Sequence, residues 1–129
     1  MKYLLDTDIV INHLRKKVMI KEVILEGGAA ISIITLGELL YGAQKADNPE
    51  ASITKLESSL SILELEIISL NKNIMIEFAI TKSRLEKLGQ RLDDFDLLIA
   101  ATAKAHSLTL VTNNIRHFSR IPNLQIEKE

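Results

Sequence analysis

Short apolar runs alternate along the chain with longer segments in which apolar residues recur every three or four positions. The runs AISII and LTLV are nearly continuous, as expected of strands that are covered on both faces of a sheet. Between Lys72 and Leu88, apolar residues at helical spacing form one stripe, which also includes Lys82. This alternation predicts an α/β fold.

We expect five strands and six helices, separated by glycine and proline. The strands are predicted at Lys2–Leu5, Ala29–Ile34, Leu65–Ser69, Leu108–Thr112 and Leu124–Ile126. The helices are predicted at Asp8–Lys16, Val18–Leu25, Leu36–Ala46, Glu50–Leu63, Lys72–Leu88 and Asp94–His106. This order is typical of a mostly parallel central sheet of four to five strands with helices on both faces.

The composition narrows this picture to a single domain, residues 1–129, with an aliphatic core. Hydrophobic residues make up 47% of the chain, but aromatic residues only 4%. The chain has no cysteine, which excludes disulfides and thiolate metal sites and fits a cytoplasmic protein. Lys21 and Glu22 interrupt the apolar stretch around them, so we expect no membrane segment. A net charge of −1 means that nucleic acid would have to bind a local basic patch.

Polar side chains follow the predicted strands, at the edge of the sheet where ligands bind in such folds. The stretch LLDTDIV places Asp6 and Asp8 directly after the first strand. Glu38 lies four residues after the second strand, and Asn114 follows the fourth. The helix before the fourth strand must begin at the same edge, because it reaches that strand through a short turn. Its first turn carries Asp96, so we expect four segments to meet at one rim.

Several of these residues also have local structural interpretations. Thr35 and Glu38 have the spacing of a helix capping box, in which the Glu38 carboxylate would accept from the Thr35 amide. Asp8 or Thr7 suffices to cap the first helix, which leaves Asp6 without a structural role.

The other acids and amides near the rim can be explained in the same way. Asp93 and Asp94 are typical N-cap residues, and the helix dipole favours Asp96 in the first turn. Asn113 and Asn114 are ordinary turn residues.

Taken together, however, the acids indicate a hard cation. Carboxylates at close range raise one another's pKa unless a cation lies between them, and all-oxygen ligands suit Mg²⁺ or Mn²⁺. Such a cation supports the hydrolysis of phosphodiesters by an activated water. The histidines are scattered and no G-x-S-x-G motif occurs, so no Ser/His/Asp arrangement competes.

Four stretches of the chain resemble those of PIN-domain ribonucleases, and most closely those of the VapC toxins of toxin–antitoxin pairs. These stretches are LLDTDIVI, ISIITLGELLYGA, DDFDLLIAATAKAHSLTLVTNN and RHF. The resemblance implies that Asp6, Glu38 and Asp96 hold the metal. It places Asn114 where many relatives carry a fourth acid and identifies Thr112 as a supporting polar residue. Asp8 and Asp94 remain supporting or capping candidates.

The resemblance also implies a three-layer PIN-like fold and metal-dependent endonucleolytic cleavage of RNA. A VapB-type antitoxin is then the expected partner, and a homodimer the expected assembly. Cations near the acidic rim would attract the RNA, although a solvated helix face explains most of them equally well. The candidates are Lys82, Arg84, Lys87, Arg91, Arg116 and Arg120.

Two alternatives remain open from the sequence. LLDTDIV also matches the opening motif of haloacid-dehalogenase-like phosphatases, in which Asp6 would be the nucleophile and Asp8 the general acid. That interpretation gives Glu38 and the LLIAATA helix no role. The other alternative is a catalytically inactive PIN-like module that binds protein, with Asn114 marking the lost activity.

Overall fold

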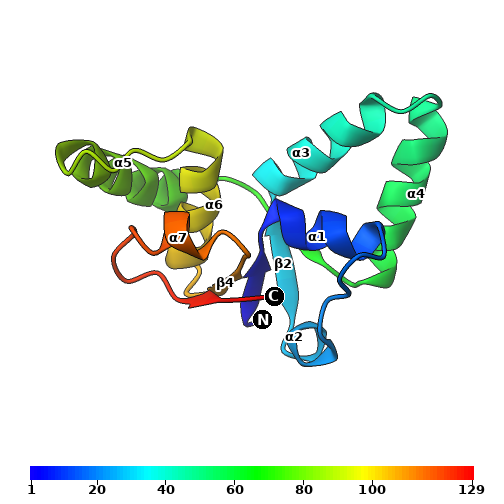
Figure 1. The fold of residues 1–129 in the computed structure, drawn as a ribbon, viewed down its shortest axis with the longest axis horizontal. Helices are drawn as coiled ribbons and strands as arrows, with labels where there is room; N and C mark the ends of the chain where they lie inside the picture. Colours follow the sequence, from blue (N-terminus) through cyan, green and yellow to red (C-terminus); the bar gives the residue numbers. More distant parts are fainter.

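The computed structural model describes residues 1–129 and contains one five-stranded sheet, in which all strands run parallel in the order β3-β2-β1-β4-β5. The strands are β1 Tyr3–Leu5, β2 Ala29–Ser32, β3 Glu66–Ile68, β4 Thr109–Val111 and β5 Ile126–Glu127. The predicted parallel sheet is confirmed. Its central strand, β1, pairs with β2 and β4, so these three strands end side by side (Figure 1).

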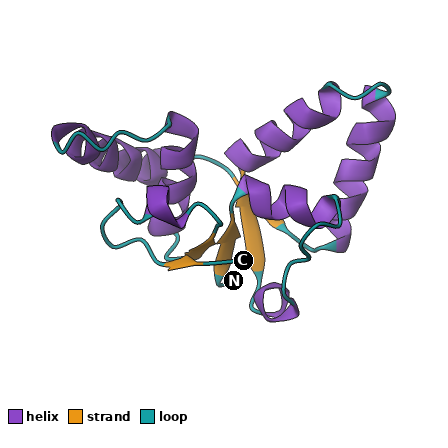
Figure 2. Cartoon of the chain, viewed as in Figure 1, coloured by secondary structure: helices purple, strands orange, loops and turns teal.

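Seven helices surround this sheet (Figure 2). They are α1 Thr7–Leu14, α2 Glu22–Glu26, α3 Ile33–Gln44, α4 Pro49–Ile62, α5 Lys72–Lys87, α6 Asp94–Ala105 and α7 Ile115–Phe118. None of them is long and apolar enough to cross a bilayer. Six correspond to predicted helices, whereas α7 was not predicted, because a single turn of four residues has no detectable hydrophobic period.

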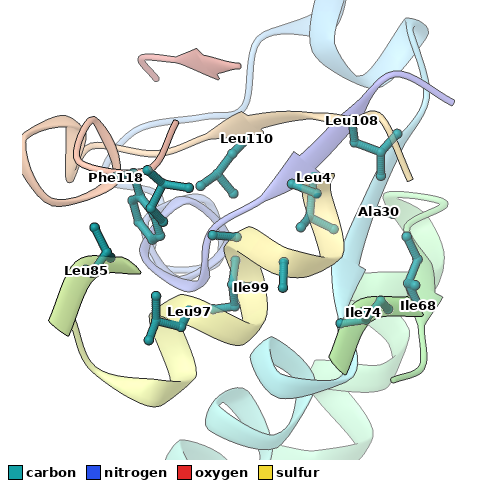
Figure 3. Close-up of a cluster of buried hydrophobic side chains, with 14 residues drawn as sticks. Leu4, Ala30, Ile68, Ile74, Leu85, Leu97, Ile99, Leu108, Leu110 and Phe118 are labelled. Atoms are coloured by element: carbon teal, nitrogen blue, oxygen red, sulfur yellow. The ribbon is translucent and has the colours of Figure 1, made fainter. Parts of the chain in front are cut away.

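Residues on the central strands alternate between two hydrophobic cores, one on each face of the sheet. Leu4 and Leu110 belong to the core that α5, α6 and α7 cover, where they pack with Phe118 (Figure 3). Leu5 and Val111, each the next residue along its strand, belong to the other core, which α1 to α4 cover. The three-layer α/β fold is therefore confirmed, and the cores are overwhelmingly aliphatic, as the composition indicated.

The predicted helix at Val18–Leu25 begins later than expected, at Glu22. The chain after α1 turns back onto α1 itself. Lys16 has a positive φ of 57°, and the backbone amide of Ile20 donates to Nδ1 of His13 at 2.9 Å. These tertiary contacts replace the local hydrogen bonds that a longer helix would require. The apolar spacing around Val18 was therefore wrongly interpreted as helix.

The predicted starts of α1 and α3 are also wrong. Both helices begin at the carboxyl edge of the sheet. Strand β2 ends at Ser32, whose hydroxyl caps α3 by accepting from the Ile34 amide at 3.0 Å. Thr35 therefore lies inside α3, and it forms no capping box with Glu38. At α1 the N-cap residue is Asp6 itself, not Asp8 or Thr7, because its carboxylate accepts from the first amide of the helix.

Candidate functional site

The carboxyl edge of the sheet opens into a cleft of about 880 Å³. Asp6 follows β1 directly, Glu38 lies in the second turn of α3, Asp96 lies in the first turn of α6, and Asn114 lies just beyond β4. All four side chains line this one cleft. The structure thus brings together the four residues that we predicted at one edge of the sheet from the order of strands and helices.

Asp6 is buried, with 7% of its surface exposed, and both of its carboxylate oxygens are held. Oδ1 accepts from the Thr7 amide at 2.8 Å, and Oδ2 accepts from the Thr112 hydroxyl at 2.7 Å. Thr112 is itself fully buried, and its hydroxyl accepts from the backbone amide of Asn114 at 3.0 Å. Burial raises the pKa of Asp6, and these two hydrogen bonds only partly oppose that shift. The carboxylate is thus fixed in place at the cleft.

Two buried threonines hold Glu38. The Thr7 hydroxyl donates to Oε1 of Glu38 at 2.7 Å, and the hydroxyl oxygens of Thr7 and Thr35 lie 3.0 Å apart. Because the single hydroxyl proton of Thr7 is directed at Glu38, Thr35 must be the donor in the second contact. This ordered chain runs from Thr35 through Thr7 to the carboxylate. Neither threonine hydroxyl was predicted to contact the Glu38 carboxylate or the other hydroxyl, so their role was missed.

Asp96 is the most strongly perturbed acid in the cleft. Its pKa is raised to about 6, first by burial and then by the negative charges of Asp6, Asp93 and Glu38, with His117 acting in the opposite direction. Asp93 occupies the N-cap position of α6 but makes no capping hydrogen bond, so it contributes charge without fixing the helix end. Burial and the neighbouring carboxylates thus both favour the protonated form of Asp96.

We expect the burial of Asp96 and the repulsion from neighbouring acids to make the metal-free protein less stable as the pH rises. The folded chain binds the Asp96 proton more tightly than the unfolded chain, so the free energy of unfolding falls between the unfolded pKa near 3.8 and the folded pKa of about 6. Asp96→Asn should remove that fall and stabilise the metal-free protein at neutral pH by ~1 kcal/mol, allowing for solvent screening.

Urea unfolding of both proteins in EDTA, at acidic and at neutral pH, measures this difference. Asp8→Asn is the control, because Asp8 is exposed. The same pH dependence in Asp96→Asn and in the wild-type protein would contradict a raised pKa of Asp96 in the folded chain.

The donor set fits a hard cation in its chemistry, since four carboxylates and no histidine or sulfur ligand line the cleft. Besides its burial, the negative charges of Asp8 and Glu38 raise the pKa of Asp6. A divalent cation would relieve the repulsion among the acids. No three acidic or histidine side chains form a ready metal-binding group as they stand. Metal binding at this cleft therefore remains a proposal.

The remaining predicted site residues lie around this centre. Asp8 is exposed and lines the cleft. Asp94 instead pairs with Lys82, at 2.9 Å, and lines a neighbouring pocket together with Lys82 and Arg91. Their ion pair is exposed and contributes little to stability.

None of the predicted RNA-binding cations lines the acidic cleft. Arg84 and Lys87 are exposed in the last turn of α5, and Arg116 is exposed on α7. The guanidinium of Arg120 donates to the carbonyl of Arg91 at 3.3 Å. Their role in RNA binding stays a prediction.

The cleft has other lining residues that sequence reasoning did not identify. They include two cations, Arg15 and Lys45, and two aromatic residues, Tyr41 and Phe95. Arg15 and Lys45 are the C-cap residues of α1 and α3, where a cation is ordinarily explained by the helix dipole. Phe95 could have been identified from the sequence. It lies between Asp94 and Asp96 in the first turn of a helix, where the surrounding acids indicate an exposed position.

Comparisons with known proteins agree with this arrangement. A model of the PIN domain matches residues 3–124. The chain therefore belongs to the PIN-domain family, and this match leaves the phosphatase alternative without support.

Within that family, the chain belongs to the VapC group. It is 36% identical to ribonuclease VapC2 of Haemophilus influenzae, over 98% of this chain and 97% of that protein. It is 32% identical to the tRNA(fMet)-specific endonuclease VapC of Salmonella typhimurium, with the same coverage of both chains. The fold superposes with a TM-score of 0.88 on a chain of VapBC2 from Rickettsia felis, solved bound to a promoter DNA fragment, at 36% identity and covering 100% and 99% of the two chains.

Proposed function

We propose that this protein is an endoribonuclease and the toxin of a toxin–antitoxin pair. The observation that carries the proposal is the cleft in which Asp6, Glu38 and Asp96 converge from three segments. The names of its relatives, ribonuclease VapC2 and tRNA(fMet)-specific endonuclease VapC, support RNA as the substrate. The VapBC assembly of the Rickettsia felis neighbour supports a VapB-type antitoxin as the partner. A homodimer remains the assembly that we propose.

Mg²⁺ or Mn²⁺ is the proposed cofactor, held by Asp6, Glu38 and Asp96. When bound, such a cation activates water and neutralises the charge that develops on the phosphoryl oxygens. The protein's contribution is to fix the ligands beforehand. Thr112 and the Thr7 amide orient Asp6, and the Thr7 hydroxyl holds one oxygen of Glu38. Asn114 is neutral, so the site offers three carboxylates.

The proposed activity requires that antitoxin-free protein cleave RNA with Mg²⁺ or Mn²⁺ and not with EDTA. We expect cleavage of cellular RNA to stop when EDTA is added and to return when Mn²⁺ is supplied in excess, because the proposed cation activates the water and offsets the charge on the phosphate. Gel electrophoresis of total RNA, followed by mapping of the cleavage ends, measures both the activity and its target.

This assay also tests the inactive-module alternative. Circular dichroism first establishes that the antitoxin-free protein is folded. Intact RNA after incubation of that folded protein with Mn²⁺ would contradict the nuclease proposal and favour a PIN fold used for protein binding alone.

A further inference from the structure

Two aromatic side chains stand exposed on the walls of the acidic cleft. Tyr41, on α3, has 66% of its surface exposed, and Phe95, on α6, has 50%. Helices α3 and α6 lie on either side of the carboxyl end of β1, so the two rings belong to different walls (Figure 1). Neither ring belongs to a hydrophobic core. Packing therefore does not explain them, although exposed aromatic rings are the groups that bind flat partners by stacking.

The same cleft is also lined by two cations. Arg15 lines it from the end of α1, and Lys45 lines it from the end of α3. The Lys45 ammonium lies 4.5 Å from the centroid of the Tyr41 ring. A positive charge is thus placed directly beside an aromatic ring that presents its remaining surface to solvent.

We propose that Tyr41 and Phe95 position the RNA in this cleft by stacking on its unpaired bases, while Arg15 and Lys45 neutralise backbone phosphates. The inference rests on the proposed ribonuclease function and names residues that position its substrate. Bases in a duplex are already stacked on one another and cannot reach the rings, whereas the bases of loops and single strands can. Any base has a flat face, so such stacking tolerates many sequences.

The charges of the cleft favour an RNA strand over a peptide. A basic peptide would be attracted by the acids but repelled by Arg15 and Lys45. An acidic peptide would be attracted by these two cations but repelled by the acids. A nucleic acid strand alternates anionic phosphates with flat bases, which matches the pairing of a cation with an aromatic ring at Lys45 and Tyr41. The two cations also offset the repulsion between the RNA phosphates and the acids of the cleft.

Fluorescence anisotropy in EDTA, where cleavage is blocked, tests the stacking. The probe is a short labelled RNA of mixed sequence, used as a single strand and annealed to its complement. We expect the single strand to bind more tightly than the duplex. Tyr41→Ala and Phe95→Ala should each weaken single-strand binding by about 5- to 100-fold, while Tyr41→Phe and Phe95→Tyr should bind nearly as well as the wild-type protein.

The salt dependence of the same binding tests the cations. Loss of one phosphate contact in Arg15→Ala or Lys45→Ala should lower the slope of log affinity against log salt by about 0.7. Lys72→Ala is the matched control, because Lys72 is exposed on α5 and does not line the cleft. All of these residues are exposed, so the variants should fold normally, which thermal unfolding checks.

Equal affinity of both alanine variants and the wild-type protein would overturn the inference, as would equal binding of the single strand and the duplex. Unchanged RNA binding together with lost binding of an arginine-containing peptide would assign the rings to peptide docking and also overturn it. Failure of the ribonuclease proposal is distinguishable, because it would show as absent cleavage by the wild-type protein in Mn²⁺.

Discussion

Asp96→Asn is expected to lower RNA cleavage by more than about 100-fold, while Asp8→Asn keeps it within about 10-fold of the wild-type rate. Loss of groups that only support metal ligands already costs 10- to 100-fold, so loss of a ligand should cost more. Asp96 is half-buried and lines the cleft together with Asp6 and Glu38. Asp8 is exposed at the margin and makes no side-chain hydrogen bond.

Initial rates on one labelled RNA, measured with saturating Mn²⁺, provide the comparison. Both variants replace a carboxylate by an amide of the same shape, so each is the steric control for the other. Binding of labelled RNA in EDTA shows that the substrate is still recognised. The reverse outcome, with Asp8→Asn inactive and Asp96→Asn active, would contradict the site described above and restore the phosphatase chemistry of the D-x-D motif.

Thr7→Val is expected to weaken Mn²⁺ binding by about 10- to 100-fold, the range found for groups that orient metal ligands. Valine matches threonine in shape but lacks the hydroxyl that donates to Glu38 at 2.7 Å. The hydrogen bond from the Thr7 amide to Asp6 does not depend on the side chain and should persist. Glu38 would then be released, and Thr35 would lose the acceptor for its own hydroxyl.

Isothermal titration calorimetry with Mn²⁺ measures this effect without any dependence on catalysis. Thr7→Ser is the matched control, because it keeps the hydroxyl and should retain most of the affinity. Thr35→Val, one hydrogen bond further from Glu38, should have a smaller effect than Thr7→Val. Wild-type affinity in Thr7→Val would show that Glu38 needs no orienting group, or does not bind the metal.

The sheet could be predicted because its buried strands appear in the sequence as short, nearly continuous apolar runs. AISII and LTLV are such runs, each with a single polar residue, and a strand covered on both faces admits few polar residues. The ends of the elements were less predictable. Ser32 and Thr35 are both competent caps for α3, and Asp6, Thr7 and Asp8 are all competent caps for α1, so residue type alone does not decide where either helix begins. The start of α2 was wrong for the same reason, since the chain before it is held by His13.

The acidic cleft was predictable as a set of residues, but not in its contacts. Topology alone places Asp6, Glu38 and Asp96 at one edge, because parallel strands end on the same side. The chain from Thr35 through Thr7 to Glu38 joins two helices that follow different strands, and no spacing within either helix indicates it. The cations that line the cleft were missed for a similar reason, since Arg15 and Lys45 approach it from the far ends of their helices.

The hydrogen bond between Thr112 and Asp6 joins residues that are 106 positions apart, and it is one of the two that fix the Asp6 carboxylate. Contacts of such high sequence separation form only after the entropy of closing the intervening loop has been overcome, which makes parallel sheets of this kind slow to fold. A partly folded chain would therefore contain the acidic residues without the geometry that positions them. Activity of the newly made protein then depends on the folding rate as well as on the chemistry of the cleft.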